Sequence, residues 1–231
     1  MYNSLCVIPA RGASKRIPRK NIIDFAGKPL IAHSIESALS SGIFDEIIVS
    51  TDDEEIAKVA KAYKASVPFM RPKELCDDYS SSNVAITHAI KEFDKMGREF
   101  QSVCCLYATA PLIDGKLLKE AFNEFQGSEC EFLFSACEFE YPIQRAFRLD
   151  DEKRVSMFDE SKYYARSQDL TPAFHDAGAF YFGKRKAWLD EKIVFKPHSR
   201  AFILPRNLVC DIDTTEDLEM AKVLFQLKER K

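Results

Sequence analysis

Short apolar runs alternate with segments of helical periodicity along most of this chain. The runs predict strands at residues 5–8, 46–50, 103–107, 132–137, 178–182, 201–204 and 208–212, and a short extended piece at residues 67–70. Apolar residues recur at the helical period within residues 30–39, 56–63, 86–93, 117–125 and 218–225. Such alternation predicts an α/β fold, with a mostly parallel sheet and helices on both of its faces. Ligands of these folds bind at the carboxyl ends of strands, so we expect the segments that follow residues 8, 50, 106 and 210 to meet in one crevice.

The alternation breaks between about residues 138 and 176. This segment is polar, aromatic and irregular, most clearly at residues 141–145 and 161–169. Its aromatic side chains would be unfavourable in a solvated linker, so the segment predicts an insertion or lid. A length of 231 residues suits one domain with such an insertion, and we expect a single domain over residues 1–231.

Charge and targeting signals limit the classes of function. Lys and Arg total 33 against 36 Asp and Glu, and a net charge of −3 disfavours nucleic-acid binding. The longest uncharged stretch, residues 100–113, is too short to span a membrane, and the N-terminus lacks the pattern of a signal peptide. Seven cysteines without Cys-x-x-Cys spacing predict reduced, mostly buried thiols in a cytoplasmic protein.

A basic segment follows the first predicted strand. Five of the 13 residues from Pro9 to Asn21 are basic, but no Walker or Gly-x-Gly-x-x-Gly pattern is present. Gly12 allows close approach of the backbone, and Ser14 offers a hydroxyl. Arg11, Lys15 and Lys20 supply three cations. These groups suit a triphosphate cradle built largely from side chains. A solvated basic loop is the alternative, and the local charge in a protein of net −3 favours the cradle.

Two aspartates interrupt the apolar run near the C-terminus. If residues 208–212 form a strand, Asp211 and Asp213 point to the same face of the sheet. Neighbouring carboxylates repel unless a cation or a shared proton lies between them. Mg²⁺ at a nucleotide site takes one or two carboxylates plus substrate phosphates, so the pair predicts a magnesium site. The alternative is that Asp213 only marks the start of the following helix.

These segments together resemble a known family. Residues 8–21, Ile-Pro-Ala-Arg-Gly-Ala-Ser-Lys-Arg-Ile-Pro-Arg-Lys-Asn, closely resemble the opening motif of the CMP-N-acylneuraminate synthetases, the acidic-sugar cytidylyltransferases. Weaker matches to that family follow in the expected order at residues 71–82, 109–112 and 211–218. The resemblance implies a three-layer, Rossmann-like nucleotidyltransferase fold with an inserted dimerisation segment. It also implies CTP and a nine-carbon acidic sugar as substrates, Mg²⁺ as cofactor, and a homodimer.

The resemblance assigns roles to individual residues. Catalytic roles fall to Arg11, Lys20 and Asp211, and the metal ligands are Asp211 and Asp213. Nucleotide contacts fall to Ala10, Arg11, Gly12, Ser14, Lys15, Lys20, Asn21, Arg71, and Ser81 or Ser82.

Two departures from the family bear on the sugar. Tyr107 and Ile113 stand where sialic-acid enzymes carry Gln and Arg, which argues against N-acetylneuraminate. Residues 141–147, 166–170 and 174–178 resemble the branch that converts CTP and pseudaminic acid to CMP-pseudaminic acid and pyrophosphate, for bacterial surface or flagellin glycosylation.

The candidate sugar contacts come from this comparison and from charge. They are Tyr107, Thr109, Arg145, Arg166, His175 and Asp176. A guanidinium suits the sugar carboxylate, with Arg166 preferred to Arg145, and either arginine alternatively forms a structural ion pair or reaches across a dimer. The alternative for His175 and Asp176 is a satisfied polar pair beneath the insertion.

Other functions stay open at this point. Relatives activate sialic acid, legionaminic acid or an eight-carbon ketodeoxy acid. A sugar-1-phosphate nucleotidyltransferase is disfavoured because its Gly-x-Gly-x-Arg-Leu loop is absent. A non-catalytic nucleotide-binding or RNA-binding protein of the same fold is the alternative from another class.

Overall fold

The computed structural model describes residues 3–76 and 82–230, and their centre is a six-stranded sheet. Its order is β10 (Ser199–Ile203), β6 (Phe132–Glu138), β9 (Phe174–Lys184), β5 (Ser102–Leu106), β1 (Ser4–Pro9) and β4 (Glu46–Ser50). Neighbouring strands are parallel except at β9, which is antiparallel to both β5 and β6. The mostly parallel sheet predicted from the sequence is therefore confirmed.

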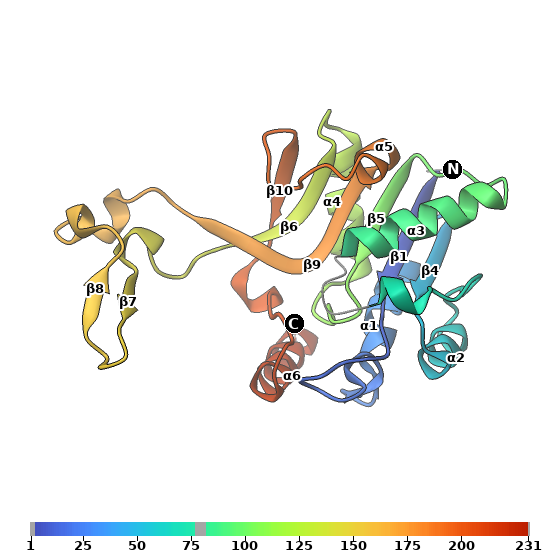
Figure 1. The fold of residues 1–231 in the computed structure, drawn as a ribbon, viewed down its shortest axis with the longest axis horizontal. Helices are drawn as coiled ribbons and strands as arrows, with labels where there is room; N and C mark the ends of the chain where they lie inside the picture. The colour runs from blue at the N-terminus through green and yellow to red at the C-terminus, as the bar shows by residue number, and fades with distance from the viewer. Residues whose placement is uncertain (1–2, 77–81, 231) are drawn as a thin grey trace.

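Helices cover both faces of this sheet (Figure 1). α1 (Leu30–Ser41), α2 (Glu54–Ala62) and α4 (Gly115–Gln126) pack on one face, and α3 (Ser82–Lys95) and α5 (Arg185–Leu189) pack on the other. Strand β1 serves both layers, because Cys6 and Ile8 join the first core while Leu5 and Val7 join the second. The three-layer α/β architecture follows from this alternation.

A third, smaller core joins the two ends of the chain. Ile17 of the basic segment and Ile212 pack with Leu218 and Ala221 of α6 (Thr215–Glu229). Short elements complete this region: η1 (Lys20–Ile22), β2 (Asp24–Phe25) and β3 (Lys28–Pro29). The N-terminal basic segment is thereby brought against the residues that precede the last helix.

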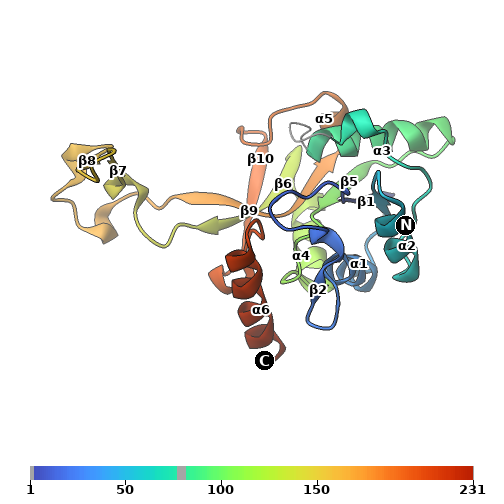
Figure 2. The same ribbon diagram turned by 60° about the horizontal axis from the view of Figure 1, so that its bottom comes forward.

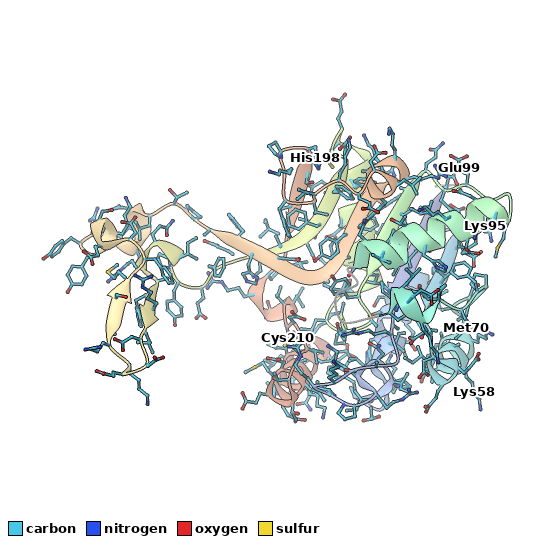
Figure 3. The ribbon with its side chains drawn as sticks, in the orientation of Figure 1. Lys58, Met70, Lys95, Glu99, His198 and Cys210 are labelled. Atoms are coloured by element: carbon cyan, nitrogen blue, oxygen red, sulfur yellow. The ribbon has the colours of Figure 1, made fainter. Side chains whose placement is uncertain are left out.

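The segment at residues 139–173 forms an arm that leaves the core, as two views show (Figures 1 and 2). It carries the hairpin of β7 (Phe147–Leu149) and β8 (Val155–Met157) and the short helices η3 (Ile143–Arg145), η4 (Glu160–Lys162) and η5 (Ser167–Asp169). Its side chains project outward (Figure 3), and Tyr141 and Tyr164 are 75% and 92% exposed. The segment expected as an insertion thus lies outside the sheet, and its exposed aromatic residues suit a binding surface.

Residues 67–70, expected as a short extended piece, follow a single bridge that joins Ser66 to Ile48; they form no strand, and Pro68 has no N–H for a ladder. One expected strand is wrong. Of the strand expected at residues 208–212, Leu208 ends η6 (Arg206–Leu208), and residues 209–212 follow as irregular chain. Their apolar character arises because Ile212 is buried in the third core instead of in a sheet. The argument that Asp211 and Asp213 share a strand face therefore fails, and their placement rests on the loop.

η2 (Lys73–Leu75) lies before the gap in the described chain. All seven cysteines are free, five of them buried. Among the described residues, no helix combines the length and apolarity that crossing a bilayer requires.

Candidate active site

A pocket of about 580 Å³ opens where β1 and β5 end, a size typical of small-ligand sites. Eleven of the candidate residues line it: Arg11, Ser14, Lys15, Lys20, Asn21, Arg71, Ser82, Tyr107, Thr109, Asp211 and Asp213. Pro9, Arg16, Leu75, Cys76 and Ala108 line it as well. The crevice expected at the strand ends is confirmed for the segments after β1 and β5 and for the residues after Cys210.

The lining carries five cations and two carboxylates. Four of the cations, Arg11, Lys15, Arg16 and Lys20, come from the basic segment, and Arg71 comes from the opposite wall. Such an excess of positive charge in a concave site favours a polyanionic ligand. The interpretation of the basic segment as a cradle for a charged ligand is therefore preferred to that of a solvated loop.

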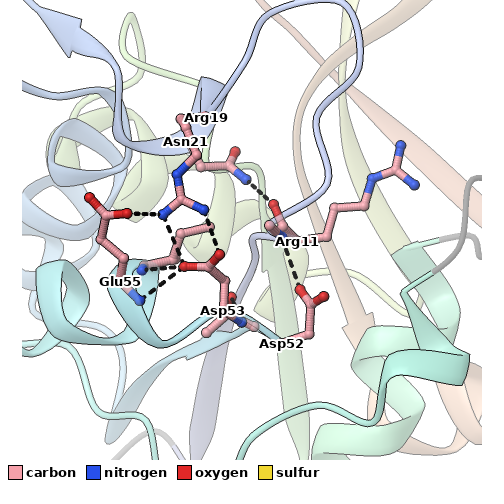
Figure 4. Close-up of polar contacts among 9 residues, drawn as sticks. Arg11, Arg19, Asn21, Asp52, Asp53 and Glu55 are labelled. Carbon is pink, nitrogen blue, oxygen red and sulfur yellow. Dashed lines mark hydrogen bonds and ion pairs between the residues drawn. The ribbon is translucent and has the colours of Figure 1, made fainter.

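Internal bonds fix the shape of the basic segment. The Asn21 side-chain amide is buried and donates to the Arg11 carbonyl at 2.9 Å, as the close-up shows (Figure 4). The Lys20 ammonium donates to the Ile212 carbonyl at 2.6 Å and to Asp213 Oδ1 at 3.2 Å. The segment therefore reaches the acidic residues near the C-terminus directly.

The acidic pair lies on either side of the buried anchor Ile212. Arg16 Nη2 lies 2.9 Å from Asp213 Oδ2, so Asp213 faces two cations, Arg16 and Lys20. Loss of hydration is the main cause that raises the pKa of Asp211, and repulsion from Asp213 is the second; Lys20 opposes the rise. Of the two carboxylates, Asp211 is therefore the one whose negative charge is less neutralised by neighbouring cations, and it also lines the pocket.

These carboxylates fit the oxygen chemistry of a magnesium ion that is shared with a nucleotide. The described residues contain no group of three His, Cys, Asp or Glu that would hold a metal without a substrate. Mg²⁺ needs only one or two carboxylates when phosphates supply the other ligands. Asp217, which also belongs to the C-terminal motif, is committed elsewhere: its Oδ2 accepts from the Thr214 N–H at 2.7 Å and completes a capping box at α6.

The wall opposite the basic segment is also ordered by side-chain bonds. Arg71 is buried, and its Nε donates to Cys76 Sγ at 2.9 Å. Ser82 Oγ lies 2.9 Å from the Tyr107 hydroxyl, and burial raises the pKa of Tyr107 to about 12. Tyr107 therefore acts as a neutral hydrogen-bonding group. The other candidate serine, Ser81, lies outside the described residues.

Four candidate sugar contacts lie away from the pocket lining. Arg145 and Arg166 are exposed on the arm, and Arg166 Nε donates to Asp169 at 2.8 Å. His175 Nδ1 lies 2.8 Å from the Asp176 carbonyl, beside β6. The Asp176 carboxylate accepts from the Gly178 N–H and from the hydroxyl of Tyr181, so it is a satisfied polar group at the base of the arm.

Some lining residues were missed by sequence reasoning. Arg16 belongs to the basic motif, but no contact was predicted for it. Its positive charge was the signal that could have identified it. Leu75 and Cys76 carry no signal, because they reach the pocket only through the turn that buries Arg71. Ala10 and Gly12 belong to the cradle backbone without lining the cavity wall.

Comparisons with known proteins show the family of this chain. The family model described as Cytidylyltransferase matches residues 5–229. A pseudaminic acid cytidylyltransferase of Campylobacter jejuni subsp. jejuni serotype O:23/36 (strain 81-176) is 62% identical to this chain, and the match covers 97% of each. An N-acylneuraminate cytidylyltransferase of Escherichia coli O18:K1:H7 is 33% identical over 98% of this chain and 53% of its own length.

A solved structure shares the fold. CMP:2-keto-3-deoxy-manno-octonic acid synthetase, complexed with CTP, superposes with a TM-score of 0.70 at 18% identity, covering 97% of this chain and 99% of the other. At that identity the likeness concerns architecture alone, and it agrees with the Rossmann-like nucleotidyltransferase fold implied by the opening motif. The family model and the relatives in sequence carry the assignment further: this chain belongs to the cytidylyltransferase family, as residues 8–21 predicted.

Proposed function

We propose that the protein is a pseudaminic acid cytidylyltransferase, which forms CMP-pseudaminic acid and pyrophosphate from CTP and pseudaminic acid. The 62% identity to a relative of that name, over 97% of both chains, carries the proposal. The enzymes named for sialic acid and for diacetyllegionaminic acid are 33% and 31% identical. The enzyme would work in the cytoplasm and supply an activated sugar for bacterial surface or flagellin glycosylation.

CTP fits the distribution of charge around the pocket. Arg11, Lys15 and Lys20 would bind the triphosphate, with Ser14 and the backbone at Gly12 close to it. On the opposite wall, Arg71 and Ser82 would contact the cytosine or ribose. Because the Asn21 amide nitrogen already donates to Arg11, its carbonyl oxygen is the group that would accept a hydrogen bond from the cytosine amine.

The reaction is a displacement at phosphorus. The anomeric hydroxyl of the sugar attacks the α-phosphorus, the bond from that phosphorus to the bridging oxygen breaks, pyrophosphate leaves, and the hydroxyl proton passes to solvent. Arg11 and Lys20 would stabilise the charge that develops on the leaving group. Asp211 and Asp213 would hold Mg²⁺, which supplies Lewis-acid polarisation and lowers the pKa of a coordinated hydroxyl.

The arm would complete the sugar site of a partner subunit in a homodimer. Arg145 and Arg166 lie on the arm, away from the pocket lining of their own chain, and the arm exposes many aromatic residues. Aromatic residues and arginine are enriched in protein interfaces. A partner's arm would bring a guanidinium to the sugar carboxylate, while Tyr107 and Thr109, which line the pocket, would contact the sugar from the chain that binds the nucleotide. His175 and Asp176 lie at the base of the arm, and Asp176 is already hydrogen-bonded there to Gly178 and Tyr181.

A panel of sugars tests the proposed substrate. We expect pyrophosphate release with CTP and pseudaminic acid, and kcat/KM values at least about tenfold lower with N-acetylneuraminate and legionaminic acid, since pockets that hydrogen-bond a substrate reject analogues by large factors. Activity confined to sialic acid or legionaminic acid would overturn the sugar assignment. CTP binding without turnover on any of these sugars would favour a non-catalytic nucleotide-binding protein.

Mixing two inactive variants tests the role of the arm. Arg166→Ala and Asp211→Asn should each lose most activity as pure dimers. Co-expressed in equal amounts, they should regain about a quarter of the wild-type activity, because half of the dimers are mixed and one of their two pockets is intact. Arg148→Ala is the matched control on the same arm and should keep its activity. Absence of recovery would mean that Arg166 acts within its own chain.

A further inference from the structure

The turn after β4, residues 51–53, supports both walls of the pocket without lining it. The Thr51 carbonyl accepts from the Arg71 N–H at 2.7 Å, on the wall opposite the basic segment. Asp52 Oδ1 accepts from the Gly12 N–H at 2.9 Å, on the wall that the basic segment forms (Figure 4). The cavity lining includes none of the three turn residues. The expectation that the segment after residue 50 meets in the crevice is therefore wrong for Thr51 and Asp52, which do not line the pocket.

Arg19 connects the basic segment to this turn. Its guanidinium donates from Nη1 to Asp53 Oδ2, from Nη2 to Asp53 Oδ1 at 3.1 Å, and also to Glu55 (Figure 4). The backbone of Arg19 is left-handed, with φ at 56°, a conformation that only a fixed surrounding makes stable for a bulky residue. Bidentate arginine–carboxylate pairs are among the most directional ionic contacts in proteins.

Asp53 is itself immobilised by α2. As the N-cap of that helix, its Oδ1 accepts from the N–H groups of Glu55 at 2.9 Å and Ile56 at 3.0 Å. The hydrogen bonds from Arg19 lower the pKa of Asp53, so its carboxylate is ionised at neutral pH. The guanidinium of Arg19 is therefore attached to a rigid helix terminus.

Gly12 of the basic segment lies close against Asp53, so the attachment needs one backbone conformation of that segment. A Cβ placed on Gly12 would lie 2.7 Å from Asp53 Oδ2 and 2.9 Å from Asp53 Cβ, so only glycine lets the two segments meet. Arg19 immediately precedes Lys20, which begins η1 and reaches Asp213. Fixing Arg19 and Gly12 fixes the backbone between them, which carries Ser14 and Lys15 and lies next to Arg11.

We propose that Arg19 and Asp53 are positioning residues, which hold the basic segment in the shape that presents Arg11 and Lys20 to the triphosphate. Arg19 does this without touching the nucleotide, although it belongs to the basic motif. The proposal rests on the proposed use of CTP. We refer to the contact between Arg19 and Asp53 as the Arg19–Asp53 clasp.

Variants that keep the local backbone test the clasp. Arg19→Asn removes the guanidinium and tolerates the left-handed conformation, and Asp53→Asn keeps a capping oxygen for α2 while removing the charge. Each should raise the dissociation constant and the KM for CTP about tenfold with a smaller change in kcat, since loss of pre-organisation mainly weakens binding. The KM for the sugar should be unchanged, and Arg19→Lys should recover part of the loss.

A double variant separates positioning from direct contact. If both residues act through the clasp, Arg19→Asn/Asp53→Asn should bind CTP no more weakly than either single variant. Additive losses would mean that Arg19 contacts the nucleotide directly, and unchanged CTP binding in Arg19→Asn would remove any role for it; either result overturns the proposal.

A second ion pair, at the start of β4, is the control. Arg98 Nη1 lies 2.8 Å from Glu46 Oε2 at the other end of β4, and its side-chain exposures, 47% and 18%, match the 39% and 21% of Arg19 and Asp53. Glu46→Gln should leave CTP binding unchanged. If this variant lost as much CTP affinity as the clasp variants, the effect of the clasp would be one on general stability. Calorimetry with CTP alone distinguishes the proposals, because it measures the clasp even if the wild-type chain turns over no sugar.

Discussion

Replacing Asp211 by asparagine should lower kcat about a hundredfold or more while the chain still folds and binds CTP. The shape of the side chain is kept and one anionic oxygen is lost, which removes a ligand suited to Mg²⁺ at the phosphates. Metal polarisation of a phosphoryl oxygen is worth several kcal/mol, and each 1.36 kcal/mol is a factor of ten in rate. Steady-state pyrophosphate release and CTP calorimetry measure the two effects separately.

The stability of the same variant provides an independent check. The raised pKa of Asp211 means that its negative charge is unfavourable in the folded protein without a ligand, chiefly because of lost hydration. A raised carboxyl pKa lowers stability above the unfolded value of about 4, so neutralising Asp211 should keep or raise the melting temperature at pH 7. Asp190→Asn, at a carboxylate paired with Lys186 on α5, is the control and should keep wild-type kcat. A wild-type kcat in Asp211→Asn would remove the metal assignment.

Replacing Lys20 by methionine should reduce kcat/KM by about a hundredfold, mostly through kcat. Methionine keeps much of the aliphatic length but loses the ammonium, and removing one pre-organised donor at developing charge typically costs about 10² to 10³ in rate. In the free protein this ammonium donates to the Ile212 carbonyl and to Asp213, so it is placed where the acidic pair and the phosphates meet. Kinetics with CTP varied at saturating sugar give the two constants.

Two further lysine variants test whether the loss of activity in Lys20→Met comes from the missing charge at that position. Lys20→Arg keeps the charge but changes its geometry, and it should lie between wild type and Lys20→Met. Lys28→Met breaks a surface pair with Glu36 outside the pocket and should have wild-type kinetics. If Lys20→Met and Lys28→Met behave alike, the charge at Lys20 has no special place in the reaction.

The parts of this fold that were predictable depend on local periodicity. Strand β1 is a short apolar run, helices α1 to α4 carry helical patterns, and the basic segment is recognisable because five cations follow an apolar strand. The Thr214 cap of α6 is likewise encoded within four residues, and its capping box is present. Each of these features is decided by residues that are close in sequence.

What was not predictable depends on contacts between distant segments. Residues 208–212 resemble a strand, but Ile212 is buried by Ile17 and α6, and no local pattern contains that information. Arg19 resembles its neighbours in the basic segment, but its partners are Asp53 and Glu55, at the start of α2. The arm lacks periodicity because its side chains do not pack on the sheet of their own chain.

The place of β9 in the sheet has a consequence for how the chain folds. Strands β1, β4 and β5 are complete once residue 106 has been synthesised, but β5 and β6 are joined only through β9 in the described sheet. Until the ribosome has made the whole arm and the strand that returns from it, β6 therefore has no partner strand, and one edge of β5 stays open. Unpaired strand edges promote aggregation, so the interval between the synthesis of β6 and β9 is the most vulnerable stage in the life of the nascent chain.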